Sequence, residues 1–324
     1  MERLKTAVIG AGYLGRFHAQ KYAAIECSHL AGVVDVNLQS AERVAAECGT
    51  RALTDYRALL GKVDAVSVVT PTPSHREIAG AFLEAGAHVL VEKPITATVE
   101  EASELIAIAS RHRRVLQVGH LERFNSAILA LDGLLTVPRF VESHRLAPFK
   151  QRGTDVNVVL DLMIHDIDII QNIVRSPITS IDAVGSSIFS GELDIANARL
   201  RFENGCVANT TASRVSLKTE RKLRLFQDDA YFSLDLHQKV MTLIRKGAGV
   251  GPDGLPQVSI DERSFSDGDA LKSEIESFLD AASTGRAPVV SGEDGRRALA
   301  TAIQITEQVE KSLQSVRRSQ QPNQ

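Results

Sequence analysis

The sequence predicts two folded regions: an N-terminal α/β domain with a doubly wound parallel sheet, and an α+β domain with a large, open-faced, mostly antiparallel sheet. In roughly the first 120 residues, apolar strands alternate with helical patterns, as in a parallel sheet with helices on both faces. From about residue 138 onward, apolar and polar residues alternate, as in strands with one buried face. A chain of 324 residues, 44% of them hydrophobic, is long enough for two cores. We expect domains at 1–120 and 121–324, with C-terminal helices packing back on the first.

The first strand, Leu4–Ile9, runs into the turn Gly10-Ala11-Gly12-Tyr13-Leu14-Gly15. Glycine allows the chain to turn out of the strand, a pyrophosphate to approach the backbone, and the following helix to lie close to the sheet. The next strand, Leu30–Val34, ends at Asp35, which is placed for ribose hydroxyls. A glycine turn alone is a weak signal, but strand, glycines, helix and acid in this order predict a Rossmann domain that binds a nicotinamide cofactor.

The residues near Asp35 indicate which nicotinamide cofactor is used. A carboxylate repels the 2′-phosphate of NADP, and the adjacent Val36-Asn37-Leu38 contains no cation to hold that phosphate. Arg43 is the nearest basic residue that argues the other way. The sequence therefore favours NAD.

Two later strand ends are expected at the same edge of the sheet as the cofactor, because ligands bind beyond the carboxyl ends of parallel strands. The first is a turn with candidate cofactor contacts at Thr70, Pro71 and His75, although it also suits a plain helix-capping turn. The second is Glu92-Lys93-Pro94, where Pro94 is a candidate cis-proline. A lysine at a strand end is often a surface charge, but this position favours a function for Lys93. The remaining strands of this domain are predicted at Ala65–Val69, His88–Val91 and Val115–Val118.

The second domain is predicted from its alternating segments and the turn residues between them. Two helical patterns follow, at Asp269–Ala282 and Gly292–Leu313, and we expect them to pack on the nucleotide-binding domain. The strands are predicted at Arg139–Arg145, Ile178–Phe189, Ile195–Phe202, Cys206–Ser213, Lys222–Asp228, Tyr231–Leu236 and Val240–Arg245.

One helix in this region, Val158–Ile170, has ionisable residues among aliphatic ones. Asp161, His165 and Asp168 are spaced to share one face, where a carboxylate can orient an imidazole for acid–base chemistry. A structural polar network is one alternative. A metal site that adds His144 is another, but the spacing does not suggest a strong site, and we expect no metal.

Together, the N-terminal fingerprint, Glu92-Lys93-Pro94, the Asp161-x-x-x-His165-x-x-Asp168 helix and the open sheet resemble the glucose-fructose oxidoreductase, inositol dehydrogenase and rhizopine-catabolism (Gfo/Idh/MocA) family over essentially the whole chain. The resemblance implies oxidation of a sugar or cyclitol hydroxyl by a nicotinamide cofactor. It also implies that Lys93, Asp161 and His165 surround the reacting carbon, and it leaves open whether Lys93 or His165 is the base. Met163 replaces a glycine of many members, which is expected to reshape the pocket.

Within the family, Gly119–Asn125 and Asp161–Asp168 are most similar to members that oxidise the 3-hydroxyl of UDP-N-acetylglucosamine. The resemblance implies a nucleotide-sugar substrate and a downstream aminotransferase that makes a 3-amino sugar for lipid A. Other sugars or inositol, or a non-catalytic cofactor-sensing regulator, are the alternatives; Lys93, Asp161 and His165 argue against the regulator. The candidate substrate contacts, for a diphosphate or the sugar, are Arg123, Arg145, Lys150, Arg152 and Asp168.

Composition narrows the partners and the location. A net charge of −3 gives no reason to expect nucleic acid as a partner. The three cysteines show no paired motif, which fits a reducing compartment. The N-terminus does not resemble a signal peptide and no segment is long and apolar enough to span a membrane. We therefore expect a cytoplasmic protein without membrane insertion. The extended sheet, with Ala196, Ala198 and Val207 expected on its outward face, predicts a homo-oligomer, either a dimer or a tetramer.

Overall fold

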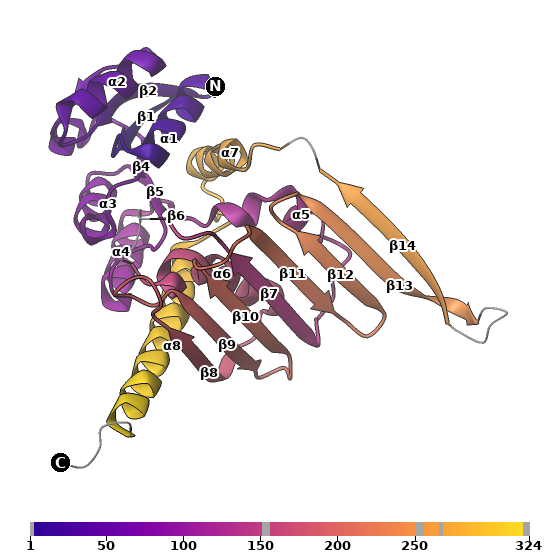
Figure 1. Cartoon of the computed structure of the whole chain (residues 1–324). Coiled ribbons are helices and arrows are strands. Elements are labelled where there is room, and N and C mark those ends of the chain that lie inside the picture. The colour runs from indigo at the N-terminus through magenta and orange to yellow at the C-terminus, as the bar shows by residue number, and fades with distance from the viewer. Residues whose placement is uncertain (1–2, 151–155, 251–255, 266–267, 320–324) are drawn as a thin grey trace. The chain divides into compact units, whose positions relative to one another are not determined.

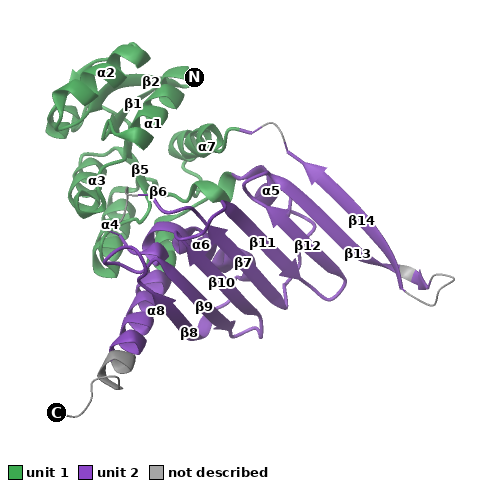
Figure 2. Cartoon of the chain, viewed as in Figure 1, with its two compact units in different colours: residues 1–124, 269–299 green, residues 125–268, 300–324 purple. Residues whose placement is uncertain are grey.

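The computed structural model describes residues 3–150, 156–250, 256–265 and 268–319. The chain divides into two compact units (Figure 2). Unit 1 comprises 1–124 and 269–299, and unit 2 comprises 125–268 and 300–324. The segment 269–299, which follows most of unit 2 in the sequence, thus groups with residues 1–124.

Unit 1 is built on a six-stranded sheet in the order β3-β2-β1-β4-β5-β6 (Figure 1). All its neighbouring strands pair in parallel. The strand order reverses between β1 and β4, and in doubly wound sheets ligands bind outside the carboxyl ends at this point. The strands are β1 (Leu4–Ile9), β2 (Ser28–Val34), β3 (Ala52–Leu53), β4 (Ala65–Val68), β5 (His88–Glu92) and β6 (Leu116–Gly119).

Three helices of unit 1 begin where a short polar side chain satisfies a free amide of the first turn. Asn37 and Asp269 accept hydrogen bonds at the starts of α2 and α7, and Thr98 forms a capping box with Glu101 at α4. The helices are α1 (Tyr13–Ala24), α2 (Leu38–Cys48), η1 (Tyr56–Leu59), η2 (Thr72–Ser74), α3 (His75–Glu84), α4 (Val99–His112), η3 (Leu121–Phe124), α7 (Ala270–Thr284) and the first part of α8 (Gly292–Ser319).

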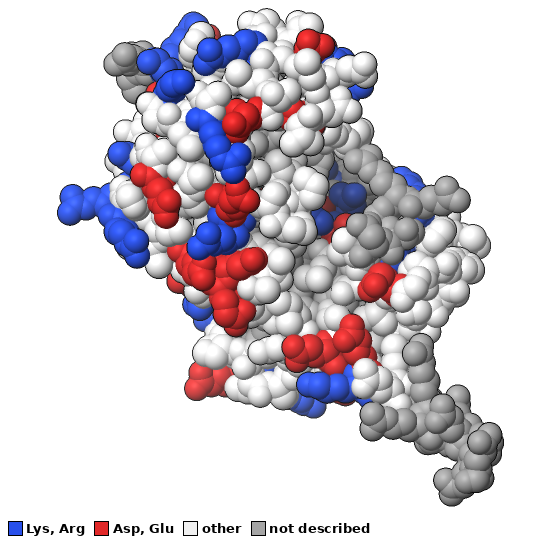
Figure 3. Space-filling view, turned by 90° about the vertical axis from the view of Figure 1, so that its left-hand side faces the viewer, with Lys and Arg blue, Asp and Glu red and all other residues white. Residues whose placement is uncertain are grey.

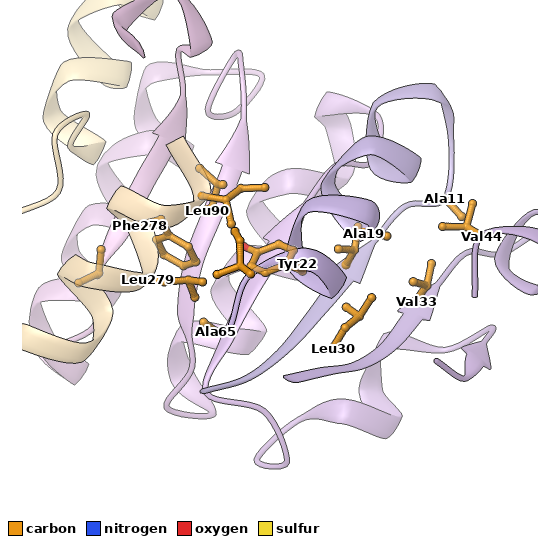
Figure 4. Packing of buried hydrophobic residues seen from close by; sticks show 14 of the residues in the cluster. Ala11, Ala19, Tyr22, Leu30, Val33, Val44, Ala65, Leu90, Phe278 and Leu279 are labelled. Atoms are coloured by element: carbon orange, nitrogen blue, oxygen red, sulfur yellow. The ribbon is translucent and has the colours of Figure 1, made fainter. Parts of the chain in front are cut away.

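Helix α7 completes one hydrophobic core of unit 1. Ile275, Phe278 and Leu279 are buried and belong to the same cluster as Tyr22 of α1 and Leu90 of β5. Figure 4 shows Phe278 and Leu279 beside the Tyr22 ring. Burying side chains of this size stabilises by about 1.5–3 kcal/mol each. Residues from opposite ends of the chain therefore form one core, which places α7 against α1 and the parallel sheet.

Unit 2 contains an eight-stranded sheet in the order β14-β13-β12-β11-β7-β10-β9-β8. β7 and β10 pair in parallel and the other neighbours are antiparallel. This confirms the predicted mostly antiparallel sheet. Its strands are β7 (Phe140–Leu146), β8 (Ile178–Ser186), β9 (Ile195–Phe202), β10 (Val207–Ser213), β11 (Glu220–Phe226), β12 (Ala230–Asp235), β13 (Val240–Val250) and β14 (Pro256–Ser264).

Helices cover one face of this sheet. α6 (Ile164–Val174) packs on β7 and β10, α5 (Ser126–Leu129) packs on β12, and Val309 of α8 lies against Gly185 of β8. Ala196 and Ala198 are fully buried. The expectation that they face outward is therefore wrong: they lie on the buried face of β9.

Charges are distributed without a dominant sign. On the face in Figure 3, basic and acidic side chains alternate in small groups. No described helix combines the length and apolarity needed to cross a membrane.

Candidate functional site

The glycine turn after β1 has the geometry that its sequence predicts. Gly10 has φ of 104°, and a Cβ there would lie 2.3 Å from the Val69 carbonyl oxygen. A Cβ on Gly15 would lie 1.8 Å from the Gly10 carbonyl oxygen. A side chain at Gly10 would therefore collide with the backbone after β4, and one at Gly15 would force the helix away from the turn.

The N-terminus of α1 is suited to an anion. Gly12 is its N-cap, without a side chain to satisfy the first amides, and no acidic residue occupies the first turn. A Cβ on Gly12 would meet no atom within 4 Å, so the backbone there is open to approach. Tyr13 and Leu14 are exposed beside it. The amides and the helix dipole can hold a pyrophosphate, so these residues fit a dinucleotide.

Asp35 follows β2 and braces this turn. Its Oδ2 accepts a hydrogen bond of 2.7 Å from the Ala11 amide, and its Oδ1 accepts one of 2.8 Å from the Asn37 amide. The half-buried carboxylate therefore lies directly beside the glycine turn. This position suits a contact with ribose hydroxyls and is unfavourable for a 2′-phosphate.

His75 joins two strand-end loops of unit 1. The ring is buried, with Nε2 2.8 Å from the Thr70 carbonyl and Nδ1 3.0 Å from the Pro94 carbonyl. Burial lowers the pKa of this histidine, whereas the two carbonyls oppose that shift. Its side chain thus holds the Thr70–Pro71 turn against the segment that contains Lys93. A direct cofactor contact by His75 stays a prediction.

The Glu92-Lys93-Pro94 segment lies at the carboxyl end of β5, and the Lys93–Pro94 peptide is cis. The Glu92 carboxylate lies 3.1 Å from His18 Nε2 and accepts a 3.3 Å hydrogen bond from the Lys93 amide. Lys93 itself is half-buried. A buried polar contact therefore fixes the backbone that presents this lysine.

In unit 2, the predicted Asp161–His165–Asp168 helix has an irregular start. Val159–Met163 forms a π-helix, which continues as α6. Asn157 begins it, because its Oδ1 accepts 3.0 Å hydrogen bonds from the Val159 and Leu160 amides. Single π-helical turns are rare in proteins, but those that occur are often found at functional sites.

Exposure distinguishes the ionisable residues of this helix. Asp161 and His165 are half-buried, whereas Asp168 is 3% exposed. Met163 is fully buried, so it affects a pocket only through the residues it packs against. His144, the residue of the alternative metal site, lies between Glu142 and Glu220 at 3.9 and 3.8 Å.

Two predicted substrate contacts have structural partners. Arg145 is 3% exposed and forms a two-pronged ion pair with Asp166, at 2.8 and 3.0 Å. Arg123, in unit 1, is also buried and donates to the Val289 carbonyl at 3.2 Å. This geometry favours structural roles for both over a contact with a diphosphate. Lys150 is exposed, and Arg152 lies outside the described residues.

Sequence reasoning missed a second group in unit 1. His18, Glu92 and Glu274 each bring one nitrogen or oxygen within 4.8 Å of the others. The relevant signal in the sequence was a glutamate on the otherwise apolar face of α7, which carries Ile275 and Phe278. Only the fold shows that this face meets α1 and the end of β5.

Two family profiles match the chain. "Oxidoreductase family, NAD-binding Rossmann fold" matches residues 4–120, and "GFO/IDH/MocA C-terminal domain" matches residues 133–233. UDP-N-acetylglucosamine 3-dehydrogenase of Acidithiobacillus ferrooxidans is 44% identical, over 97% of this chain and 100% of that protein. The scyllo-inositol 2-dehydrogenase (NAD(+)) of Bacillus subtilis is 25% identical, over 94% and 93%.

Solved structures agree in fold. A structure of the Acidithiobacillus ferrooxidans enzyme matches with a TM-score of 0.91, covering 97% of this chain and 100% of that one. Levoglucosan dehydrogenase in complex with NADH matches with a TM-score of 0.84 at 19% identity, covering 96% and 98%, and shares the fold. This chain is therefore an NAD-binding oxidoreductase that belongs to the Gfo/Idh/MocA family.

Proposed function

We propose that this protein oxidises the 3-hydroxyl of UDP-N-acetylglucosamine to a ketone, with NAD as the acceptor. The observation that carries this proposal is the 44% identity that runs through 97% of this chain and the full length of the Acidithiobacillus ferrooxidans enzyme. The similarity therefore includes the segments after residue 120 that would select a substrate. The keto product is a substrate for an aminotransferase, and a 3-amino sugar for lipid A is the proposed use.

Unit 1 supplies the cofactor contacts in this proposal. The amides after Gly12 hold the pyrophosphate, and Asp35 holds the ribose and disfavours NADP. Thr70 and Pro71 border the same edge of the sheet. Bound NAD supplies the acceptor for the hydride that leaves C3.

Side chains of this protein accept the proton of the substrate hydroxyl and stabilise the charges that result. His165 takes the hydroxyl proton, and Asp161 orients the imidazole and stabilises its charge. Lys93 donates a hydrogen bond to the same oxygen and stabilises the negative charge that develops as the carbonyl forms. We assign the base to His165 because histidine is the most frequent general base in enzymes, and Lys93 is then the hydrogen-bond donor.

For the substrate's diphosphate, exposed Lys150 and the neighbouring Arg152 are the proposed contacts. Asp168 is buried, so we assign it to the support of the helix rather than to the sugar. All three cysteines are free thiols, which agrees with the proposed cytoplasmic location.

The test is a panel of UDP-sugars, free sugars and inositols, each with NAD and with NADP, followed by the absorbance of the reduced cofactor. We expect turnover of UDP-N-acetylglucosamine with NAD and a product lighter by two hydrogen atoms in mass spectrometry. Position-specific deuterium at C3 should appear in the reduced cofactor. A higher kcat/KM for inositol or a free sugar would contradict the proposed substrate while leaving the enzyme class intact.

A further inference from the structure

A buried group of ionisable residues in unit 1 includes Glu92, the residue that precedes Lys93. His18 comes from α1, Glu92 from the end of β5 and Glu274 from α7. Glu274 is fully buried, and the Glu92 side chain is 14% exposed. We call Glu92 and Glu274 the acid pair; one oxygen of each and one ring nitrogen of His18 lie within 4.8 Å of one another.

The two acids have different surroundings. Glu92 faces His18 Nε2 at 3.1 Å and accepts from the Lys93 amide at 3.3 Å. Neither carboxyl oxygen of Glu274 has a hydrogen-bond partner among the described residues. The Gln117 side-chain amide donates a 3.2 Å hydrogen bond to the backbone carbonyl of Glu274. This bond does not involve the Glu274 carboxyl group.

The elements that surround the acid pair carry further ionisable groups. α1 contributes His18 and Tyr22, which both contact Ser67 Oγ, at 3.1 and 2.8 Å. The β5 end contributes Glu92 and Lys93. η3, which packs on α7, carries buried Glu122 and Arg123, and Arg123 donates to the Val289 carbonyl.

Two carboxylates this close in a buried site repel each other, so one of them keeps its proton. Burial raises the pKa of Glu92, but the hydrogen bond and charge of His18, together with the charge and amide of Lys93, outweigh burial and lower it. Burial, followed by the charge of Glu92, raises the pKa of Glu274 well above its usual range. The proton therefore belongs on Glu274.

We propose that the acid pair holds a single proton, on Glu274, and that the remaining charge on Glu92 positions Lys93 for the proposed oxidation. The Glu92 carboxylate can position Lys93 because it accepts a hydrogen bond from the Lys93 amide, while His18 holds the carboxylate in place. Gly119 leaves room for it: a Cβ there would lie 3.0 Å from the Glu92 carboxyl atoms. The positioning part rests on the proposed function; the shared proton does not.

The shared proton is tested by the pH dependence of stability. A raised pKa means that the folded protein holds this proton more tightly than the unfolded chain does. The stability from this proton is complete below the ordinary glutamate pKa of about 4.3, and it is lost as pH rises toward the raised value. Glu274→Gln keeps the shape of the neutral acid but does not titrate. Its melting temperature relative to the wild type should rise by several degrees between about pH 5 and about pH 8.

The control is Glu276→Gln on the same helix. Glu276 is 48% exposed at its side chain and lies 3.6 Å from Lys272. Its melting temperature relative to the wild type should stay nearly constant over the same pH range. A constant difference for Glu274→Gln as well would overturn the shared proton.

A bound cation is the rival explanation for the same residues, since two carboxylates and an imidazole can ligate zinc. Elemental analysis of the purified protein decides between them. We expect no stoichiometric metal. One equivalent of zinc that His18→Ala and Glu274→Gln both remove would overturn the proposal.

The positioning part is tested with Glu92→Gln, which removes the charge and keeps the size. With UDP-N-acetylglucosamine and NAD, we expect kcat to fall at least tenfold with a smaller change in KM, while Glu92→Asp, which retains the charge, recovers part of the loss. Unchanged kcat in a folded Glu92→Gln protein would contradict it. If the wild type does not oxidise this sugar, the proposed function fails, and the melting series still decides the shared proton.

Discussion

At the scale of single residues, Lys93 is the side chain on which the proposed chemistry depends most directly. Lys93→Met keeps the length of the stem and removes the donor, so the fold should remain and kcat should fall about 100- to 1000-fold. Circular dichroism and a rate assay check the two parts. Lys62→Met, at an exposed lysine of the same unit, is the matched control. A folded Lys93→Met enzyme with turnover near the wild type would exclude the assignment.

Asp35 makes a second prediction at this scale. Asp35→Ser removes the ribose contact and the repulsion of a 2′-phosphate, so the ratio of kcat/KM with NAD to that with NADP should fall about tenfold or more. Some loss of stability should accompany it, because Asp35 also bonds the Ala11 and Asn37 amides. Steady-state kinetics with both cofactors measures the ratio. An unchanged ratio would mean that the carboxylate does not face the ribose.

Sequence patterns indicated the candidate residues that are defined by local spacing. The three glycines and Asp35 belong to one strand–turn–helix unit, so their order alone predicted the cofactor site. Glu274 stands out in the sequence only as a glutamate on an apolar helix face, because its partners come from segments that meet it only in the folded unit. The partner of Arg145 was likewise not predictable, because Asp166 meets it only in the folded unit.

At the scale of elements, the Arg145–Asp166 pair joins β7 to α6 inside unit 2. Removing one partner leaves the other charge buried, which typically costs about 3–5 kcal/mol. Arg145→Met should therefore lower the free energy of unfolding by about this amount, and adding Asp166→Leu should restore much of it. Urea unfolding measures both variants.

The control is an exposed pair in the same unit. Arg139 and Asp228 are 70% and 76% exposed at their side chains, and Arg139→Met should change stability little. If Arg145→Met were as mild as Arg139→Met, the buried pair would not be the link that holds α6 on the sheet.

Elements were predictable where burial alternates. β9 was predicted at its observed bounds because every second residue of it is buried. β14 was missed because it is exposed almost throughout and so has no apolar period. The π-helical start of the Asp161 helix was also missed, because the hydrophobic pattern indicates a helix there without distinguishing a π-helical turn from an α-helical one.

At the scale of the whole molecule, the chain crosses between its two units more than once. The apolar stripe of α7 indicated that this helix would be buried, and it was expected on the nucleotide-binding domain, although the stripe does not identify the residues that the helix meets there. The contacts of Phe278 with the Tyr22 cluster give that answer. α8 begins in unit 1 and continues into unit 2, so no single cut in the sequence separates the units.

The face of the unit 2 sheet opposite α5, α6 and α8 is a second large surface of this unit. It carries an aromatic row of Phe140, Phe226 and Tyr231, with ring centroids 5.6 and 4.8 Å apart. Glu142 of β7 and Arg224 of β11 lie opposite each other, two residues along from the Phe140–Phe226 pair, and form an ion pair of 2.9 Å. The apolar character of this face comes from these rings and not, as first expected, from Ala196 and Ala198.

We predict that this face pairs with a second copy of the chain about a two-fold axis, because like faces of a sheet bury each other most simply in a dimer. Light scattering at micromolar concentration should give a multiple of 35.1 kDa. Phe226→Lys places a charge in the middle of the aromatic row and should shift the protein toward the monomer. Val258→Lys, at an exposed position on edge strand β14, changes the charge equally and should leave assembly intact. A monodisperse wild-type monomer would refute the prediction, and an oligomer insensitive to Phe226→Lys would move the interface to another surface.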